Sequence, residues 1–72
     1  MPLDPFARTY AGWAEAFSIF ARYPDDEPGV AVERDKILAG PDPNIVSLPD
    51  LARLLALGWY SDDTLECFYR LV

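Results

Sequence analysis

Histidine is absent from this chain of 72 residues, and cysteine occurs only once. Without histidine, a general base near neutral pH would need a carboxylate or a thiol with a strongly shifted pKa. One cysteine and no histidine also exclude the usual zinc ligand sets. The lone Cys67 cannot close an intramolecular disulfide, and a small domain without such a bond suits a reducing compartment. We therefore expect a cytoplasmic protein with no zinc site.

Long apolar runs and glycine-rich loops are missing as well. No stretch is long enough to span a bilayer, and the N-terminal residues lack the basic and apolar segments of a signal peptide. Gly29, Gly40 and Gly58 each stand alone, so no glycine-rich loop precedes a helix to bind phosphate. We expect neither membrane association nor a bound cofactor.

Basic residues are few: six Lys and Arg stand against twelve Asp and Glu, which gives a net charge of −6. Such a surface repels nucleic acid and favours basic protein partners. The carboxylates gather in or beside expected turns, at Asp25, Asp26, Glu27, Glu33, Asp35, Asp42, Asp62, Asp63 and Glu66. This pattern favours a protein that binds a partner over an enzyme, although a charge of this size also serves solubility alone.

What the chain does contain is enough apolar material to fold. Residues 1–72 form one small domain, which buries only about 60% of its unfolded surface. Just over half of the residues are hydrophobic and 14% are aromatic, too many for a disordered tail.

The first helix is predicted from Asp4 to Tyr23, with Asp4 as N-cap and Pro5 in the first turn. Pro24 ends it. Aromatic residues recur within it at helical spacing and predict one stripe on one face: Phe6, Tyr10, Trp13, Phe17 and Phe20.

The rest of the chain predicts a hairpin, a second helix and a second hairpin. Residues 30–39 read as two short strands around a polar turn, and residues 40–44 read as irregular chain. Ser47 and Asp50 resemble a capping box for a helix from Pro49 to Leu57, which Gly58 ends. Residues 59–71 read as two further strands around an acidic turn.

The predicted fold is therefore a small α+β domain of order α-β-β-α-β-β. An antiparallel sheet of about four strands carries both helices on one face, and its other face is open to solvent or to a partner. The strand residues expected to pack against the helices are Val30, Val32, Ile37, Trp59, Cys67, Tyr69 and Leu71.

Six short blocks of the sequence, at residues 17–23, 30–37, 40–41, 46–47, 54–59 and 67–70, form a combination that resembles a known family. The chain is similar from Trp13 onward to small uncharacterised proteins encoded by bacteriophages, prophages and other mobile elements. Those proteins often place a histidine before the aspartate of the first hairpin, where this chain has Arg34. The resemblance implies a biological context, in which small acidic proteins commonly inhibit host nucleic-acid machinery.

The leading hypothesis is a non-enzymatic inhibitor that binds a host protein with a basic, nucleic-acid-binding surface, as anti-CRISPR proteins do. Contact would be made either by mimicry of DNA or by an ordinary acidic interface, with no direct contact to nucleic acid. The candidate partner-binding residues are Asp25, Asp26, Glu27, Glu33, Asp35, Asp62, Asp63 and Glu66.

Other interpretations compete with this one. The run from Asp25 to Glu27 lacks the spaced ligands of a calcium loop, so a solvated turn is favoured over a metal site. Cys67 is expected to be a buried structural residue. The alternative function is a structural module that self-associates through the open sheet face or an edge strand, and the working unit is either a monomer or a homodimer.

Overall fold

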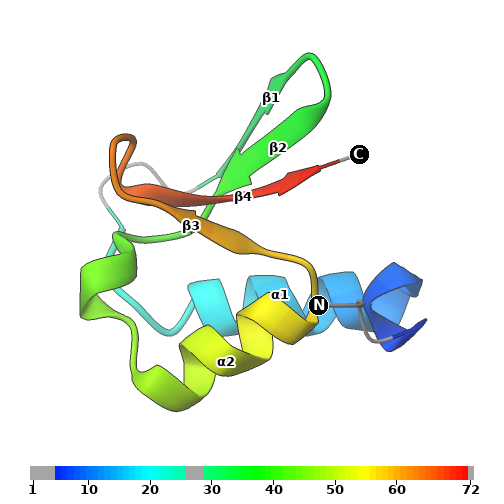
Figure 1. Cartoon of the computed structure of the whole chain (residues 1–72). Helices are drawn as coiled ribbons and strands as arrows, with labels where there is room; N and C mark the ends of the chain where they lie inside the picture. Colours follow the sequence, from blue (N-terminus) through cyan, green and yellow to red (C-terminus); the bar gives the residue numbers. More distant parts are fainter. Residues whose placement is uncertain (1–4, 26–28, 72) are drawn as a thin grey trace.

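The N-terminal aromatic segment forms two helical pieces in place of the single helix predicted from Asp4 to Tyr23. The computed structural model describes residues 5–25 and 29–71, so Asp4 lies outside the described residues. A 3-10 helix, η1 (Pro5–Arg8), precedes α1 (Tyr10–Phe20) (Figure 1). The residue between them, Thr9, has extended backbone and accepts a hydrogen bond from the Gly12 N–H at 3.1 Å.

Thr9 is therefore the N-cap of α1, and the prediction that the helix begins at Asp4 is wrong. The bend also depends on Gly12, because a Cβ there would lie 2.2 Å from the Phe6 carbonyl oxygen. Only glycine lets η1 fold back this closely against the first turn of α1.

The predicted aromatic stripe is confirmed only in part. Trp13, Phe17 and Phe20 all pack around Trp59, with ring centroids 5.7, 5.9 and 5.1 Å from the Trp59 ring. Tyr10, by contrast, is 97% exposed and points away from the core. The stripe fails at its start because α1 begins only at Tyr10.

The first hairpin forms as predicted, from β1 (Val30–Glu33) and β2 (Lys36–Ala39), which pair antiparallel. A two-residue turn joins them, and Arg34 adopts a φ of 37° in it. The turn-rich segment that follows contains a short 3-10 helix, η2 (Pro43–Ile45), which Asp42 caps by accepting a hydrogen bond from the Asn44 N–H.

The second helix, α2 (Leu48–Ala56), agrees with its prediction to within one residue at each end. Ser47 is its N-cap and accepts a hydrogen bond from the Asp50 N–H at 3.4 Å. Gly58 follows the helix with a φ of 94°, as expected of a glycine that ends a helix. Among the described residues, no helix is both long and apolar enough to cross a bilayer.

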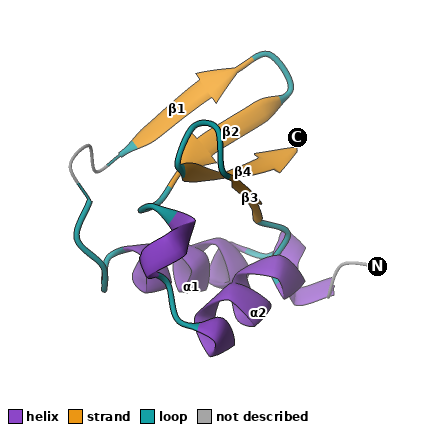
Figure 2. Ribbon diagram, turned by 60° about the vertical axis from the view of Figure 1, so that its left-hand side comes forward, coloured by secondary structure: helices purple, strands orange, loops and turns teal. Residues whose placement is uncertain are grey.

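The second hairpin consists of β3 (Tyr60–Asp62) and β4 (Cys67–Leu71). The four strands form one antiparallel sheet in the order β1-β2-β4-β3. Figures 1 and 2 show α1 and α2 on one side of this sheet, with the β1–β2 hairpin extending beyond them. The predicted α+β fold and its element order are confirmed.

The side chains of β4 face opposite to the prediction. Phe68 and Arg70 point toward the helices and are buried, with relative exposures of 1% and 8%. Because side chains alternate along a strand, their neighbours fall on the other face. The prediction is therefore wrong for Cys67, Tyr69 and Leu71.

Arg70 is buried because backbone carbonyls at two helix ends accept its guanidinium hydrogen bonds. Nη1 donates to the carbonyl of Leu57, and Nη2 donates to that of Ala7 at 3.1 Å. The guanidinium also stacks over the Trp13 ring, 4.4 Å from its centroid. Burial lowers the pKa of Arg70, and the nearby Arg8 lowers it further. Arg70 thus joins η1, α2 and β4.

β1 departs from the prediction too, because all four of its residues are exposed. Val30 and Val32, expected in the core, are 56% and 70% exposed. The core lies instead under β2, β4 and the start of β3, and it consists of Ala16, Ile19, Phe20, Ala39, Val46, Leu54, Leu57, Trp59 and Phe68.

Candidate acidic interaction site

A hollow of about 850 Å³ lies where the start of β1, the segment after β2 and the β3–β4 turn come together. Four carboxylates line it, from Asp25, Glu33, Asp42 and Glu66, together with apolar residues such as Leu38, Ile45 and Leu65. No Lys or Arg occurs among the described residues of its lining. We call this surface the acidic hollow.

Each carboxylate of the acidic hollow is held by a different part of the fold. Asp25 follows the end of α1, and Glu33 is the last residue of β1. Asp42 caps η2, while Glu66 precedes β4 with a φ of 54°. The fold thus brings residues that are far apart in sequence to one surface.

Asp62 serves the turn beside the hollow. One of its carboxylate oxygens, Oδ1, accepts hydrogen bonds from the backbone N–H groups of Thr64 at 3.0 Å and Leu65 at 3.1 Å. Such an arrangement fixes a tight turn through an aspartate side chain. Asp62 therefore has a structural role in this turn. The interactions described in the structure include no similar role for its neighbour Asp63.

Cys67 lines part of the acidic hollow, and its pKa shows the effect of the nearby carboxylates. Its thiol is half-buried on the face away from the helices, so the prediction of a core cysteine is wrong. Burial raises the pKa of Cys67, and the carboxylates of Asp62, Asp25 and Glu33 raise it further, with Lys36 acting weakly against them. The thiol is thus held neutral, which disfavours a nucleophilic role.

The structure brings together part of the predicted partner-binding set. Asp25, Glu33 and Glu66 line the acidic hollow, and Asp62 lies near enough to affect Cys67. Asp35 and Asp63 lie in the two hairpin turns, outside the described lining.

Two further members of that set, Asp26 and Glu27, lie outside the described residues. The predicted set also omitted Asp42, which does line the hollow. Its position in a turn-rich segment was the only signal in the sequence, and that signal did not show which surface the turn would face.

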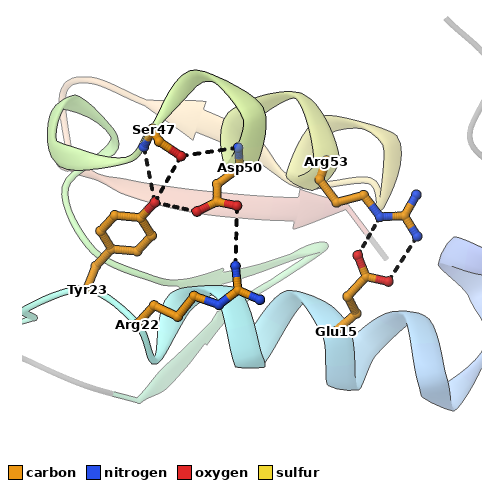
Figure 3. A network of polar contacts seen from close by, with 6 residues as sticks. All are labelled: Glu15, Arg22, Tyr23, Ser47, Asp50 and Arg53. Atoms are coloured by element: carbon orange, nitrogen blue, oxygen red, sulfur yellow. Dashed lines mark hydrogen bonds and ion pairs between the residues drawn. The ribbon is translucent and has the colours of Figure 1, made fainter.

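A second polar cluster lies between the two helices (Figure 3). The Tyr23 hydroxyl donates to the Asp50 carboxylate and accepts a hydrogen bond from the Ser47 N–H at 3.1 Å. Arg22 pairs with the same carboxylate at 3.4 Å. These contacts tie the chain after α1 to the first turn of α2.

One turn further along, Glu15 of α1 forms a two-bond ion pair with Arg53 of α2. The hydrogen bond from Arg53 and its positive charge lower the pKa of Glu15, against a smaller opposing effect of burial. The groups of this cluster bind one another, so we assign it to the packing of the helices.

The acidic hollow has a simple chemical capacity: it presents carboxylate acceptors beside apolar surface. This combination suits Lys and Arg side chains, whose apolar stems can pack while their charged ends pair. Within residues 5–25 and 29–71, no group of three or more Cys, Asp and Glu side chains is arranged to hold a metal ion. Comparisons with protein-family models, curated proteins and solved structures find no match to this chain.

Proposed function

We propose that this chain is a small non-enzymatic inhibitor from a phage or another mobile element. It binds the basic, nucleic-acid-binding surface of a host protein through the acidic hollow. The observation that carries the proposal is the gathering of Asp25, Glu33, Asp42 and Glu66 around one surface with no basic residue in its described lining.

Long-range charge supports the same proposal. A net charge of −6 on 72 residues attracts a basic partner before contact and speeds association at low salt. The carboxylates of the hollow would then pair with Lys and Arg that otherwise contact phosphates. The partner's nucleic acid would be excluded either because the carboxylates mimic phosphates or because the bound domain blocks the surface.

The test is a tagged pull-down from bacterial lysate at low and moderate salt, with captured proteins identified by mass spectrometry. One variant reverses two charges of the hollow, Glu33→Lys with Glu66→Lys. Its matched control reverses two carboxylates outside the described lining, Asp35→Lys with Asp63→Lys, and so has the same net charge. Thermal melts establish that both variants fold.

We expect the wild type and the turn variant to capture the same nucleic-acid-binding complex at low salt, and the hollow variant to lose it. Purified complex should then lose binding to its nucleic acid when the wild type is added. Equal capture by both variants would show that the hollow is not the contact surface, and an unimpaired complex would remove the inhibitory role.

Self-association is the second candidate function, and the open face of the sheet favours it. The Tyr60 and Tyr69 rings contact each other there with centroids 5.5 Å apart and a tilt of 33°, and Leu71 is 58% exposed. A dimer through this face would cover these side chains. Sedimentation at high protein concentration tests it: a dimeric mass that Tyr69→Ser abolishes would support this function, and a monomeric mass would contradict it.

A further inference from the structure

β1 is an edge strand with apolar side chains that nothing in the described part of the chain covers. It pairs with β2 on one side only, because the strand order places it at the end of the sheet. Val30 and Val32 are 56% and 70% exposed. An edge strand also presents unpaired backbone N–H and C=O groups, which can pair with an incoming strand.

A second hollow lies on the helix side of this edge. It has a volume of about 370 Å³ and is lined mainly by apolar side chains, among them Phe17 and Phe20 of α1 and Val30 of β1. Phe17 lies outside the buried core and is 38% exposed, so part of its aromatic ring is accessible to solvent. We call this surface the edge groove, and Asp25 lines both it and the acidic hollow.

The two faces of β1 therefore differ in chemistry. Val30 and Val32 pair in register with Ala39 and Ile37 on the helix side of the sheet. Glu33 points to the opposite side, where it lines the acidic hollow. A strand added beyond β1 would continue this alternation, with one set of side chains beside the valines and the other set beside Glu33.

We propose that an extended segment of the basic partner adds to β1 as a fifth, edge strand of the sheet. The segment alternates apolar and basic residues. Its apolar side chains lie beside Val30, which lines the edge groove, and beside Val32, while its Lys or Arg side chains lie over the acidic hollow. The backbone pairs with β1, as in other peptide-binding domains that use strand addition.

Charge complementarity selects this occupant over a second copy of the chain. Two copies joined edge to edge would bring two net charges of −6 together, which repel each other. A basic segment instead reduces the negative charge at Asp25 and Glu33. This inference rests on the proposed function for the sign of the partner, but the mode of binding is tested separately.

The probes are two synthetic peptides of about six residues, the usual length of a strand. One alternates, acetyl-Val-Lys-Val-Lys-Val-Lys-amide, and the other has the same composition without alternation, acetyl-Val-Val-Lys-Lys-Lys-Val-amide. Affinity is measured by calorimetry, and hydrogen exchange of backbone amides is followed by NMR. A third peptide carries N-methyl groups on the amides along one edge of the alternating sequence.

We expect the alternating peptide to bind about tenfold more tightly than the other two and to protect alternate amides of β1 from exchange. Val30→Thr with Val32→Thr keeps the branched side chains of a strand but removes apolar contact, and should weaken binding about fivefold. Leu71→Thr, an equally exposed leucine away from this edge, is the matched control and should change nothing.

Equal affinity for all three peptides, or no added protection in β1, would overturn strand addition. If the peptides bound equally well to the wild type but not to the Glu33→Lys, Glu66→Lys variant, the acidic hollow would remain the contact surface. The proposed function would then stand without strand addition. Failure of every peptide to bind would overturn the inference, and the lysate pull-down would decide the proposed function independently.

Discussion

The two faces of the sheet differ in what their side chains do. On the helix side, Trp59 and Phe68 are 1% exposed, and the rings of α1 surround Trp59. On the opposite side, Leu71 is 58% exposed and Tyr69 is half-buried. The helix side therefore holds the core of the fold, while the opposite side leaves large side chains partly exposed.

Charged groups divide in the same way. On the helix side, Arg53 pairs with Glu15, and Arg70 is satisfied by backbone carbonyls. On the opposite side, carboxylates line a hollow whose described lining includes no Lys or Arg. Carboxylates gathered on one surface repel one another, and this repulsion lowers stability.

The largest expected effect comes from truncating the centre of the core. Trp59→Ala removes the ring that Trp13, Phe17 and Phe20 contact, and should destabilise the domain by about 3–5 kcal/mol. Leu71→Ala, the control on the opposite face, should change stability by less than about 1 kcal/mol. Urea unfolding followed by circular dichroism measures both.

Such a loss is a large part of the stability expected of a small domain, so Trp59→Ala should be mostly unfolded at 37 °C. Similar losses for the two variants would mean that the open face is covered in solution, and would favour self-association over an open binding face.

Local chemistry in the sequence predicted most of the fold. Ser47, Gly58 and the polar turn at Arg34 fix where elements begin, end or reverse, and each acts through its immediate neighbours. The prediction of a single N-terminal helix is wrong, because the break between η1 and α1 depends on the close packing of η1 against Gly12. No local sequence pattern shows this contact.

It is harder to predict which side chains of each strand point toward the helices. Phe68 and Tyr69 are both aromatic, so hydrophobicity alone cannot tell which of them faces the helices. The burial of Arg70 could not be expected either, because a buried arginine is unusual without a carboxylate partner. Only the helix ends that supply the carbonyls of Leu57 and Ala7 explain its burial.

The sequence predicts which kind of residue forms the candidate site, but not which surface of the fold carries it. The sequence shows that carboxylates gather near turns, but only the sheet order brings Asp25 and Glu66 to one surface. Asp35 and Asp63 lie outside the described lining, although Asp63 is in the same turn as Glu66, which does line it.

A smaller effect is expected from the polar contacts between the helices. Tyr23→Phe removes the hydroxyl that binds Asp50 and Ser47, and should destabilise the domain by about 0.5–1.5 kcal/mol. Tyr10→Phe makes the same chemical change at a side chain that is 97% exposed, and should have an effect within about 0.5 kcal/mol. Thermal unfolding of both variants compares them, and equal effects would show that the Tyr23 hydroxyl adds nothing to helix packing.

The smallest effect is expected from the ion pair between Glu15 and Arg53, and it should depend on pH. Arg53 lowers the pKa of Glu15 below its ordinary value of 4.5, so the folded state binds this proton less readily than the unfolded state. The pair therefore adds stability above pH 4.5 and loses it as the pH falls through the lowered pKa.

Glu15→Gln should accordingly be slightly less stable than the wild type at neutral pH, and the difference should vanish in acid. Glu33→Gln is the control, since Glu33 is exposed on the opposite face of the sheet and lies among other carboxylates. Since Glu33 also lies opposite Lys36 in register and is exposed, its loss should change stability little at neutral pH. A difference between Glu15→Gln and wild type that stays constant from neutral to acid pH would show that the ion pair does not stabilise the helix side.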